Sequence, residues 1–266
     1  MSLIIVIKFA LYSFLLGHLI AKNDSYKILL TDIISDKKKY DEHIINRSTG
    51  FHEITGFKQS DSSNGIILVH GFYPQGWRSK GFEWAEPIKN FSKAGLPMWL
   101  YRYDWNQCPS ITARQINLDL ATLLEKNNHL ESIIIIGHSF GGLIVTLFSE
   151  IWESPFSIDA HVIASGLAKS KFDREYLNCE NPKKTKYYIS KHIEYTQWRT
   201  IKNQDGIFKR LNYDPQVVTF INGKTTLLPK KWKSTRVGHN FSILVVSDII
   251  LSDLQKNKQT NFLKKQ

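Results

Sequence analysis

The sequence predicts an α/β fold, a doubly wound and mostly parallel sheet flanked by helices. The first observation behind this prediction is alternation: short apolar runs, which suit buried parallel strands, alternate with stretches whose apolar residues recur at helical spacing. The second is that no internal repeat, low-complexity tract or Pro/Gly/Ser-rich linker divides the 266 residues. In such sheets the functional groups lie at the carboxyl ends of the strands.

The clearest predicted strands are short apolar runs, and those at 65–71 and 132–137 end at a glycine. Such continuous runs are typical of strands that are covered on both faces. The predicted strands are residues 65–71, 97–103, 132–137 and 160–164, and the best later candidates are 192–198 and 216–221.

Helices are predicted between these runs from the spacing of apolar side chains. In the first helix, for example, Phe82, Ala85 and Ile88 fall on one face. The predicted helices are residues 82–94, 111–124, 143–152 and a closing helix at about 241–255.

The N-terminus has a different composition from the rest of the chain. Residues 1–21 carry a single charge, Lys8, and residues 9–21 are an uncharged run of thirteen. A core of this length suits an export signal and is shorter than the roughly 20 residues of a spanning helix. Residues 1–21 are therefore predicted to be a signal peptide or a membrane anchor, with one domain at 22–266. Either role would make the domain exported (secreted or periplasmic) or membrane-anchored; a buried N-terminal element is the alternative.

The formal net charge of +11 is concentrated in one segment. Residues 166–236 hold 16 Lys and Arg against 6 Asp and Glu, whereas residues 22–165 hold 14 against 16. Such a basic segment favours an anionic membrane surface or an anionic substrate, and Lys-rich solvated loops are the plainer interpretation. No zinc-ligand spacing, phosphate-binding glycine loop or base-stacking motif is visible, so no metal, cofactor or nucleic acid is expected.

A Gly-x-Ser-x-Gly motif follows the third predicted strand and runs into an apolar helical stretch. A serine hydroxyl is a weak nucleophile and must be presented on a sharp strand-to-helix turn. Gly137 and Gly141 allow that turn to close without Cβ clashes. The first amides of the helix would face a developing oxyanion. Ser139 is therefore the predicted nucleophile, and His138 beside it is predicted to be a packing residue.

With this motif in place, the chain resembles the α/β-hydrolase family, in particular its lipase and esterase branch, over about residues 64–255. Ile67-Leu-Val-His-Gly-Phe72 is similar to the family's oxyanion strand and loop. The resemblance implies an α/β-hydrolase fold. It also implies an oxyanion hole made by the backbone amides of Phe72 and Phe140.

A second match concerns the base. Val237-Gly-His-Asn-Phe-Ser242 lies one hundred residues beyond the nucleophile and resembles the family's catalytic-histidine loop. The resemblance therefore implies that His239 is the general base, which takes the proton of Ser139 and returns it to the leaving group.

The acid is less strongly marked. The order of nucleophile, acid and histidine restricts it to a carboxylate between Ser139 and His239. Asp205, in Asn-Gln-Asp-Gly, resembles the family's acid turn and is the favoured residue. Asp214 is the alternative, although Asp before Pro is more often a turn former. Asp173 would serve if the acid followed the preceding strand.

These matches imply a serine hydrolase that cleaves carboxylic esters through an acyl-enzyme. Residues 166–191 have the length and composition of a lid, and they mix cations with aromatic residues. With the apolar N-terminus, this composition favours lipid or acyl esters as substrates. An acyltransferase, thioesterase or amidase with the same triad is the alternative within enzymes. A membrane-associated binding protein with a non-catalytic hydrolase fold is the alternative from another class.

The two cysteines allow two interpretations. Cys108 and Cys179 could form one disulfide across a long loop, as in an exported protein, or remain free thiols. Neither has metal-ligand spacing or the local sequence of a catalytic cysteine.

Overall fold

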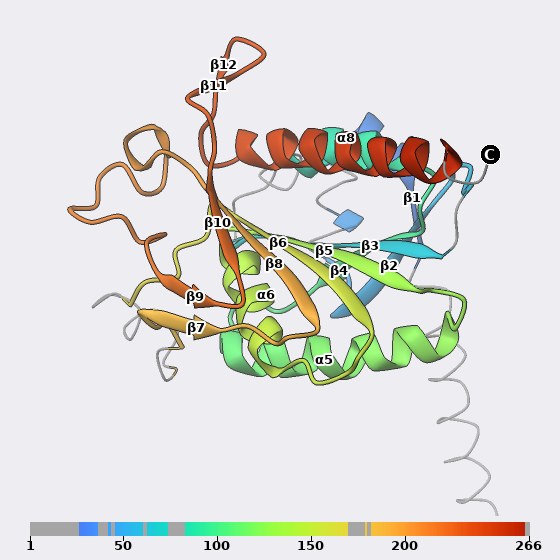
Figure 1. Cartoon of the computed structure of the whole chain (residues 1–266), viewed down its shortest axis with the longest axis horizontal. Coiled ribbons are helices and arrows are strands. Elements are labelled where there is room, and N and C mark those ends of the chain that lie inside the picture. The colour runs from blue at the N-terminus through green and yellow to red at the C-terminus, as the bar shows by residue number, and fades with distance from the viewer. Residues whose placement is uncertain are drawn as a thin grey trace, which may run out of the picture.

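A computed structural model of the chain describes residues 27–36, 42–43, 46–60, 63–73, 83–169, 179 and 182–263. Its centre is an eight-stranded sheet with the strand order β1-β2-β4-β3-β5-β6-β8-β10 (Figure 1). The predicted signal peptide or anchor lies outside the described residues, as do residues 170–178 and 180–181 of the predicted lid, and both assignments stay predictions. Within the described ranges, no helix has the length and apolar character needed to cross a membrane.

The main sheet is mostly parallel, which confirms the predicted fold class. All neighbouring pairs from β4 to β10 in the strand order are parallel. β2 runs antiparallel to β4, and β1 pairs with β2 in parallel. The strands are β1 (Lys27–Leu29), β2 (Gly50–Thr55), β3 (Asn64–Val69), β4 (Met98–Arg102), β5 (Ser132–His138), β6 (Ser157–Ile163), β8 (Ile193–Arg199) and β10 (Lys224–Leu227).

Helices cover both faces of the sheet. On one face α8 contacts α4, and on the other α5 contacts α6 (Figure 1). All four predicted helices are present with shifted ends, and Phe82, where the first was predicted to begin, lies outside the described residues. The helices are α2 (Leu30–Ser35), α4 (Ala85–Ser92), α5 (Pro109–Lys126), α6 (Phe140–Ile151) and α8 (Phe241–Leu263), with a 3₁₀ turn, η2, at Lys202–Gln204.

The apolar runs of the sequence form the core. In β5 the four consecutive isoleucines, residues 133–136, are all buried, because β5 lies inside the sheet and helices lie on both faces, with α6 in contact with β5 itself. Burial of each such side chain contributes roughly 1.5–3 kcal/mol. A continuous apolar run, rather than alternation, is therefore the correct signature of this strand.

The last part of the sheet differs from the prediction. The candidate strand at 216–221 forms only as β9 (Thr219–Ile221), which pairs with β7 (Lys186–Tyr188) in a separate small sheet. The eighth strand of the main sheet is β10, which was not predicted. Three of its four residues are exposed, so it carries no buried apolar run that could have indicated it.

Cys108 and Cys179 are joined by a disulfide, with their Cα atoms 5.7 Å apart. The bond links the residue that precedes α5 to the basic segment. A closed loop of 71 residues restricts the unfolded chain enough to add about 4 kcal/mol of stability in the chain-entropy treatment. Of the two interpretations of the cysteines, the structure has the bonded one.

The order of the strands places the functional edge. β4 and β5 lie on opposite sides of β3, so the direction of chain progression reverses between β3 and β5. In sheets of this kind, ligands bind at the carboxyl ends of the strands beside such a reversal. His70 and Gly71 follow β3 there, and Ser139 follows β5.

Candidate active site

Ser139 occupies a sharp turn between β5 and α6. Its φ of 54° and ψ of −118° belong to neither element, and a non-glycine residue in this region is strained by about 1–3 kcal/mol. The surrounding structure holds the turn, since the Ser139 amide donates to the carbonyl of Ile163 at 2.9 Å. The hydroxyl is thereby presented at the end of the sheet.

The two motif glycines are required by close packing. A Cβ on Gly137 would lie 2.6 Å from the carbonyl oxygen of Gly141, and one on Gly141 would overlap the carbonyl oxygen of His70. Neither backbone atom can move aside cheaply. The glycines therefore let the strand-to-helix turn close, as the sequence indicated, and they also let α6 begin directly against the end of β3.

Three predicted residues, from distant parts of the chain, form one hydrogen-bonded chain. The hydroxyl Oγ of Ser139 lies 2.9 Å from Nε2 of His239, and Nδ1 of His239 lies 2.9 Å from Oδ2 of Asp205. With a proton on Nδ1, the imidazole donates to the carboxylate and accepts from the serine hydroxyl. Asp205 is fully buried and His239 is 8% exposed.

The loop of His239 is held through its backbone carbonyl. This oxygen accepts hydrogen bonds from Nε2 of His138, at 3.0 Å, and from the hydroxyl of Ser242. Burial and, to a smaller extent, the electrostatic effect of the nearby His239 lower the pKa of His138 well below its ordinary value. The His138 ring is therefore neutral and carries its proton on Nε2. His138 is buried as predicted, and it also positions His239.

Asp205 is held as an ionised acceptor. Thr200 Oγ1 donates to its Oδ2 at 2.6 Å, and the amides of Ile207 and Phe208 donate to its Oδ1 at 2.9 and 3.1 Å. Burial alone would raise the pKa of Asp205, but its hydrogen bonds from His239, Thr200 and Ile207 outweigh it and hold the pKa below its ordinary value.

The alternative acid has a different set of partners. Asp214 forms an ion pair with Arg199 at 3.0 Å and accepts from the amide and side chain of Gln216. Gln216 is fully buried. Its side-chain Oε1 accepts from the amide of Thr200, and its Nε2 donates to the carbonyl of Thr200. Asp214 thus supports the residue that supports Asp205. Asp173, the third candidate, lies outside the described residues.

Thr200, Gln216 and Ser242 were not singled out in the sequence. Thr200 and Gln216 are common polar residues without a local motif, and their roles depend on contacts between elements, whereas Ser242 belongs to the matched histidine loop and donates to the carbonyl three residues before it. One signal was available for Thr200, since it directly follows β8 and therefore lies at the carboxyl edge of the sheet.

The loop after β3 is held by two aromatic side chains. Nδ1 of His70 donates to the carbonyl of Gly71 at 2.7 Å, and the hydroxyl of Tyr103 donates to the carbonyl of His70 at 2.8 Å and also lies 3.1 Å from that of Gly71. Because the C=O and N–H of a trans peptide point in opposite directions, these bonds also fix where the Phe72 amide points. A Cβ on Gly71 would lie only 3.4 Å from Cβ of Ser139, so this peptide lies beside the serine.

The second predicted oxyanion donor is the amide of Phe140. Phe140 is the first residue of α6, where backbone N–H groups have no partner within the helix. Phe72 and Phe140 also meet through their rings, whose centroids are 6.2 Å apart. The structure thus brings the two predicted residues into contact with each other beside Ser139, and their role as donors remains a proposal.

Tyr103→Phe tests whether the direction of the Phe72 amide matters. We expect kcat for an ester to fall about tenfold with little change in KM, because an oxyanion donor acts mainly in the transition state. The matched control is Tyr101→Phe, which removes a hydroxyl that donates to Asp119 on α5 instead. Equal kcat values for the two variants would show that Tyr103 has no such role.

The neutral His70 also predicts how stability depends on pH. Burial, helped by the charge of Arg102, lowers the pKa of His70 from 6.5 to about 3. Below pH 6.5 the unfolded chain binds a proton at this residue that the folded protein excludes. The free energy of unfolding should therefore decrease as the pH is lowered, by up to about 1.4 kcal/mol per pH unit from His70. In urea titrations from pH 7 to 4, His70→Asn should show a shallower slope than the unchanged protein. Identical slopes would contradict the assignment.

Comparisons with known proteins find similar solved structures at low sequence identity, and no family. No protein-family model and no curated protein matches the sequence. Similar solved structures include Est1E from Butyrivibrio proteoclasticus, with 14% identity over 74% of this chain and 89% of that one and a TM-score of 0.47. They also include a lipase-esterase related protein from Clostridium acetobutylicum, with 15% identity over 78% and 98% and a TM-score of 0.46. A carboxylesterase from Nitrososphaera gargenis has 14% identity over 79% and 96% and a TM-score of 0.47.

The fold of the chain is that of the α/β hydrolases, as the sequence resemblance implied. The features that define this fold are the eight-stranded, mostly parallel sheet, the helices on both of its faces and the serine turn between β5 and α6. The solved structures, at 14–15% identity and TM-scores of 0.46–0.47, add nothing about the chemistry of this chain, which has to be argued from its own residues.

Proposed function

We propose that the protein is a serine hydrolase that cleaves carboxylic esters through an acyl-enzyme. The observation that carries the proposal is the hydrogen-bonded chain of Ser139, His239 and Asp205, with 2.9 Å at both contacts. A nucleophile in contact with a base, and that base oriented by a buried carboxylate, is the arrangement that this chemistry needs.

In the first half of the reaction, Oγ of Ser139 bonds to the ester carbonyl carbon while its proton passes to Nε2 of His239. The carbonyl oxygen becomes an oxyanion and accepts from the amides of Phe72 and Phe140; each such donor is typically worth about 3 kcal/mol in the transition state. When the intermediate collapses, the bond to the alcohol oxygen breaks and His239 returns the proton to it. The acyl group stays on Ser139.

Water completes the cycle by the same steps. His239 takes a proton from the water as the water oxygen bonds to the acyl carbon; the bond to Oγ of Ser139 then breaks, His239 returns the proton to Oγ, and the carboxylic acid is released. Asp205 stays ionised throughout, and it stabilises the imidazolium that forms twice in each turnover. The depressed pKa of Asp205 supports this role.

We further propose that the substrates are lipid or other acyl esters and that residues 1–21 export or anchor the enzyme. The support is compositional: an apolar N-terminal run of thirteen residues and a basic segment that includes the predicted lid. The same triad can cleave thioesters or amides or transfer acyl groups, because the pocket selects the leaving group.

The experiment that tests the proposed function is hydrolysis of p-nitrophenyl esters from acetate to palmitate by the full-length protein in mild detergent, with Ser139→Ala alongside. Serine-dependent release would support the esterase, and a preference for long chains would support acyl lipids. Release from a matched thioester or anilide alone would reassign the chemistry. Folded protein that acts on none of these compounds would favour the non-catalytic binding protein.

A further inference from the structure

A small hairpin projects from the body of the molecule just before the histidine loop. It consists of β11 (Lys231–Trp232) and β12 (Thr235–Arg236), and Figure 1 shows it standing clear of the sheet beside the start of α8. We call residues 230–236 the basic hairpin. Its base is closed by the Val237 amide, which donates to the Lys230 carbonyl at 3.1 Å.

The backbone of the basic hairpin is well defined. Lys231 pairs with Arg236 and Trp232 with Thr235. Lys233 and Ser234 have φ values of 45° and 67°, as the tight two-residue turns of hairpins require. The hairpin therefore has a defined backbone from which its side chains project.

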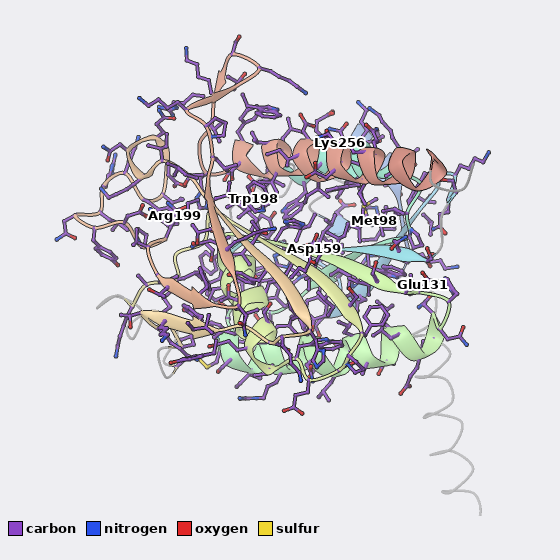
Figure 2. All side chains as sticks on the ribbon, in the orientation of Figure 1. Met98, Glu131, Asp159, Trp198, Arg199 and Lys256 are labelled. Atoms are coloured by element: carbon purple, nitrogen blue, oxygen red, sulfur yellow. A yellow bond between two sulfur atoms is a disulfide. The ribbon has the colours of Figure 1, made fainter. Side chains whose placement is uncertain are left out.

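The basic hairpin carries four cations and no acid. Lys233 pairs with Asp248 of α8 at 2.7 Å. Lys230, Lys231 and Arg236 are exposed and, among the residues that the structure describes, have no carboxylate within ion-pair distance. Figure 2 shows nitrogen-tipped side chains extending outward from this hairpin.

Apolar side chains are exposed on the same edge of the molecule. Leu227, at the carboxyl end of β10, is 60% exposed, and Ile207, two residues after Asp205, is 49% exposed. His239 is only three residues beyond the hairpin. Cations and apolar groups thus occur together close in sequence to the proposed acid and base.

The aromatic residue of the hairpin points the other way. Nε1 of Trp232 donates to Oδ2 of Asp248 at 3.1 Å, so the ring is turned back onto α8. Proteins that bind single-stranded nucleic acid offer aromatic rings for base stacking. Exposed cations beside exposed aliphatic groups, without such a ring, fit a phospholipid surface better.

We propose that the basic hairpin binds anionic phospholipid headgroups and holds the carboxyl edge of the sheet against a membrane surface. The inference deepens the proposed function, on which it rests for the idea that esters in that surface are the substrates. The binding itself requires only Lys230, Lys231 and Arg236.

The test is co-sedimentation of the full-length Ser139→Ala protein with vesicles of phosphatidylglycerol and phosphatidylcholine, or of phosphatidylcholine alone. Any binding through residues 9–21 would occur with both vesicles, so the measured quantity is the ratio of the two affinities. Replacing Lys230, Lys231 and Arg236 by Ala should reduce this ratio about 100-fold at low salt, since each cation near an anionic surface contributes about 1 kcal/mol. High salt should have a similar effect.

The matched control replaces three exposed lysines near the amino ends of strands, at the opposite edge of the sheet: Lys93, Lys126 and Lys191. It changes the net charge equally and should leave the ratio unchanged. An equal loss in both variants, or no loss in the hairpin variant, would overturn the proposal. Binding of the unchanged hairpin to heparin or DNA but not to vesicles would overturn it in favour of a polyanion. Because the binding test uses the Ser139→Ala protein, its outcome does not depend on whether the unchanged protein hydrolyses esters, and failure of the two proposals can be told apart.

Discussion

Ser139→Ala should reduce ester turnover by at least about 10⁴-fold. Its hydroxyl is the group that bonds to the substrate, so its loss removes the covalent pathway and leaves only the assistance of oriented backbone donors. Alanine has the same backbone restrictions as serine, and the turn at φ 54° should be retained. The effect is measured as initial rates on a p-nitrophenyl ester. The amount of folded protein in each sample is checked by its thermal unfolding transition.

Ser165→Ala is the matched control. Ser165 is also buried beside the turn, where its Cβ would lie 2.8 Å from a Cβ on Gly142, and within the described residues its hydroxyl has no hydrogen-bond partner. Its replacement should change turnover by less than about threefold, because no hydrogen bond is lost. Comparable activity in the Ser139 and Ser165 variants would rule out Ser139 as the nucleophile.

Asp205→Asn should reduce kcat by about 10⁴-fold while leaving the protein folded. An amide at this position can donate to Nδ1 of His239, which favours the wrong tautomer and gives no support to the imidazolium. Single-turnover rates measured with the folded variant would report the loss directly.

Asp214→Asn separates the two candidate acids. Asp214 contacts Arg199 and Gln216, so its loss should lower thermal stability, by up to a few kcal/mol, while reducing turnover far less than Asp205→Asn. The reverse order of effects would assign the acid to Asp214. Thermal unfolding of both variants distinguishes lost chemistry from lost structure.

The part of the fold that could be predicted is the part with a one-dimensional signal. β3, β4 and β5 each contain an uninterrupted apolar run, residues 66–69, 98–101 and 133–136, because layers of helices cover both faces of the sheet. β10 carries no such run, and it joins the sheet by pairing with β8, a partner more than twenty residues away. A strand that is defined by its partner rather than by its own burial leaves little trace in the sequence.

The same distinction applies to the candidate site. Ser139 and His239 are marked by short motifs whose glycines and neighbours are local, and Asp205 by an Asp-Gly turn. The contact of His138 with the histidine loop joins residues 101 positions apart, and that of Tyr103 with the Gly71 carbonyl spans 32. No local pattern encodes such contacts, so the groups that position the site appear only in three dimensions.

The central claim is that Ser139 is an activated nucleophile. The most direct measurement is reaction of the full-length protein with a fluorophosphonate, followed by mass spectrometry of its peptides. If His239 and Asp205 activate Ser139, one adduct should form, on Ser139. It should be absent in Ser139→Ala and should form much more slowly in Asp205→Asn. Folded protein that forms no adduct, or an adduct on another residue, would contradict it.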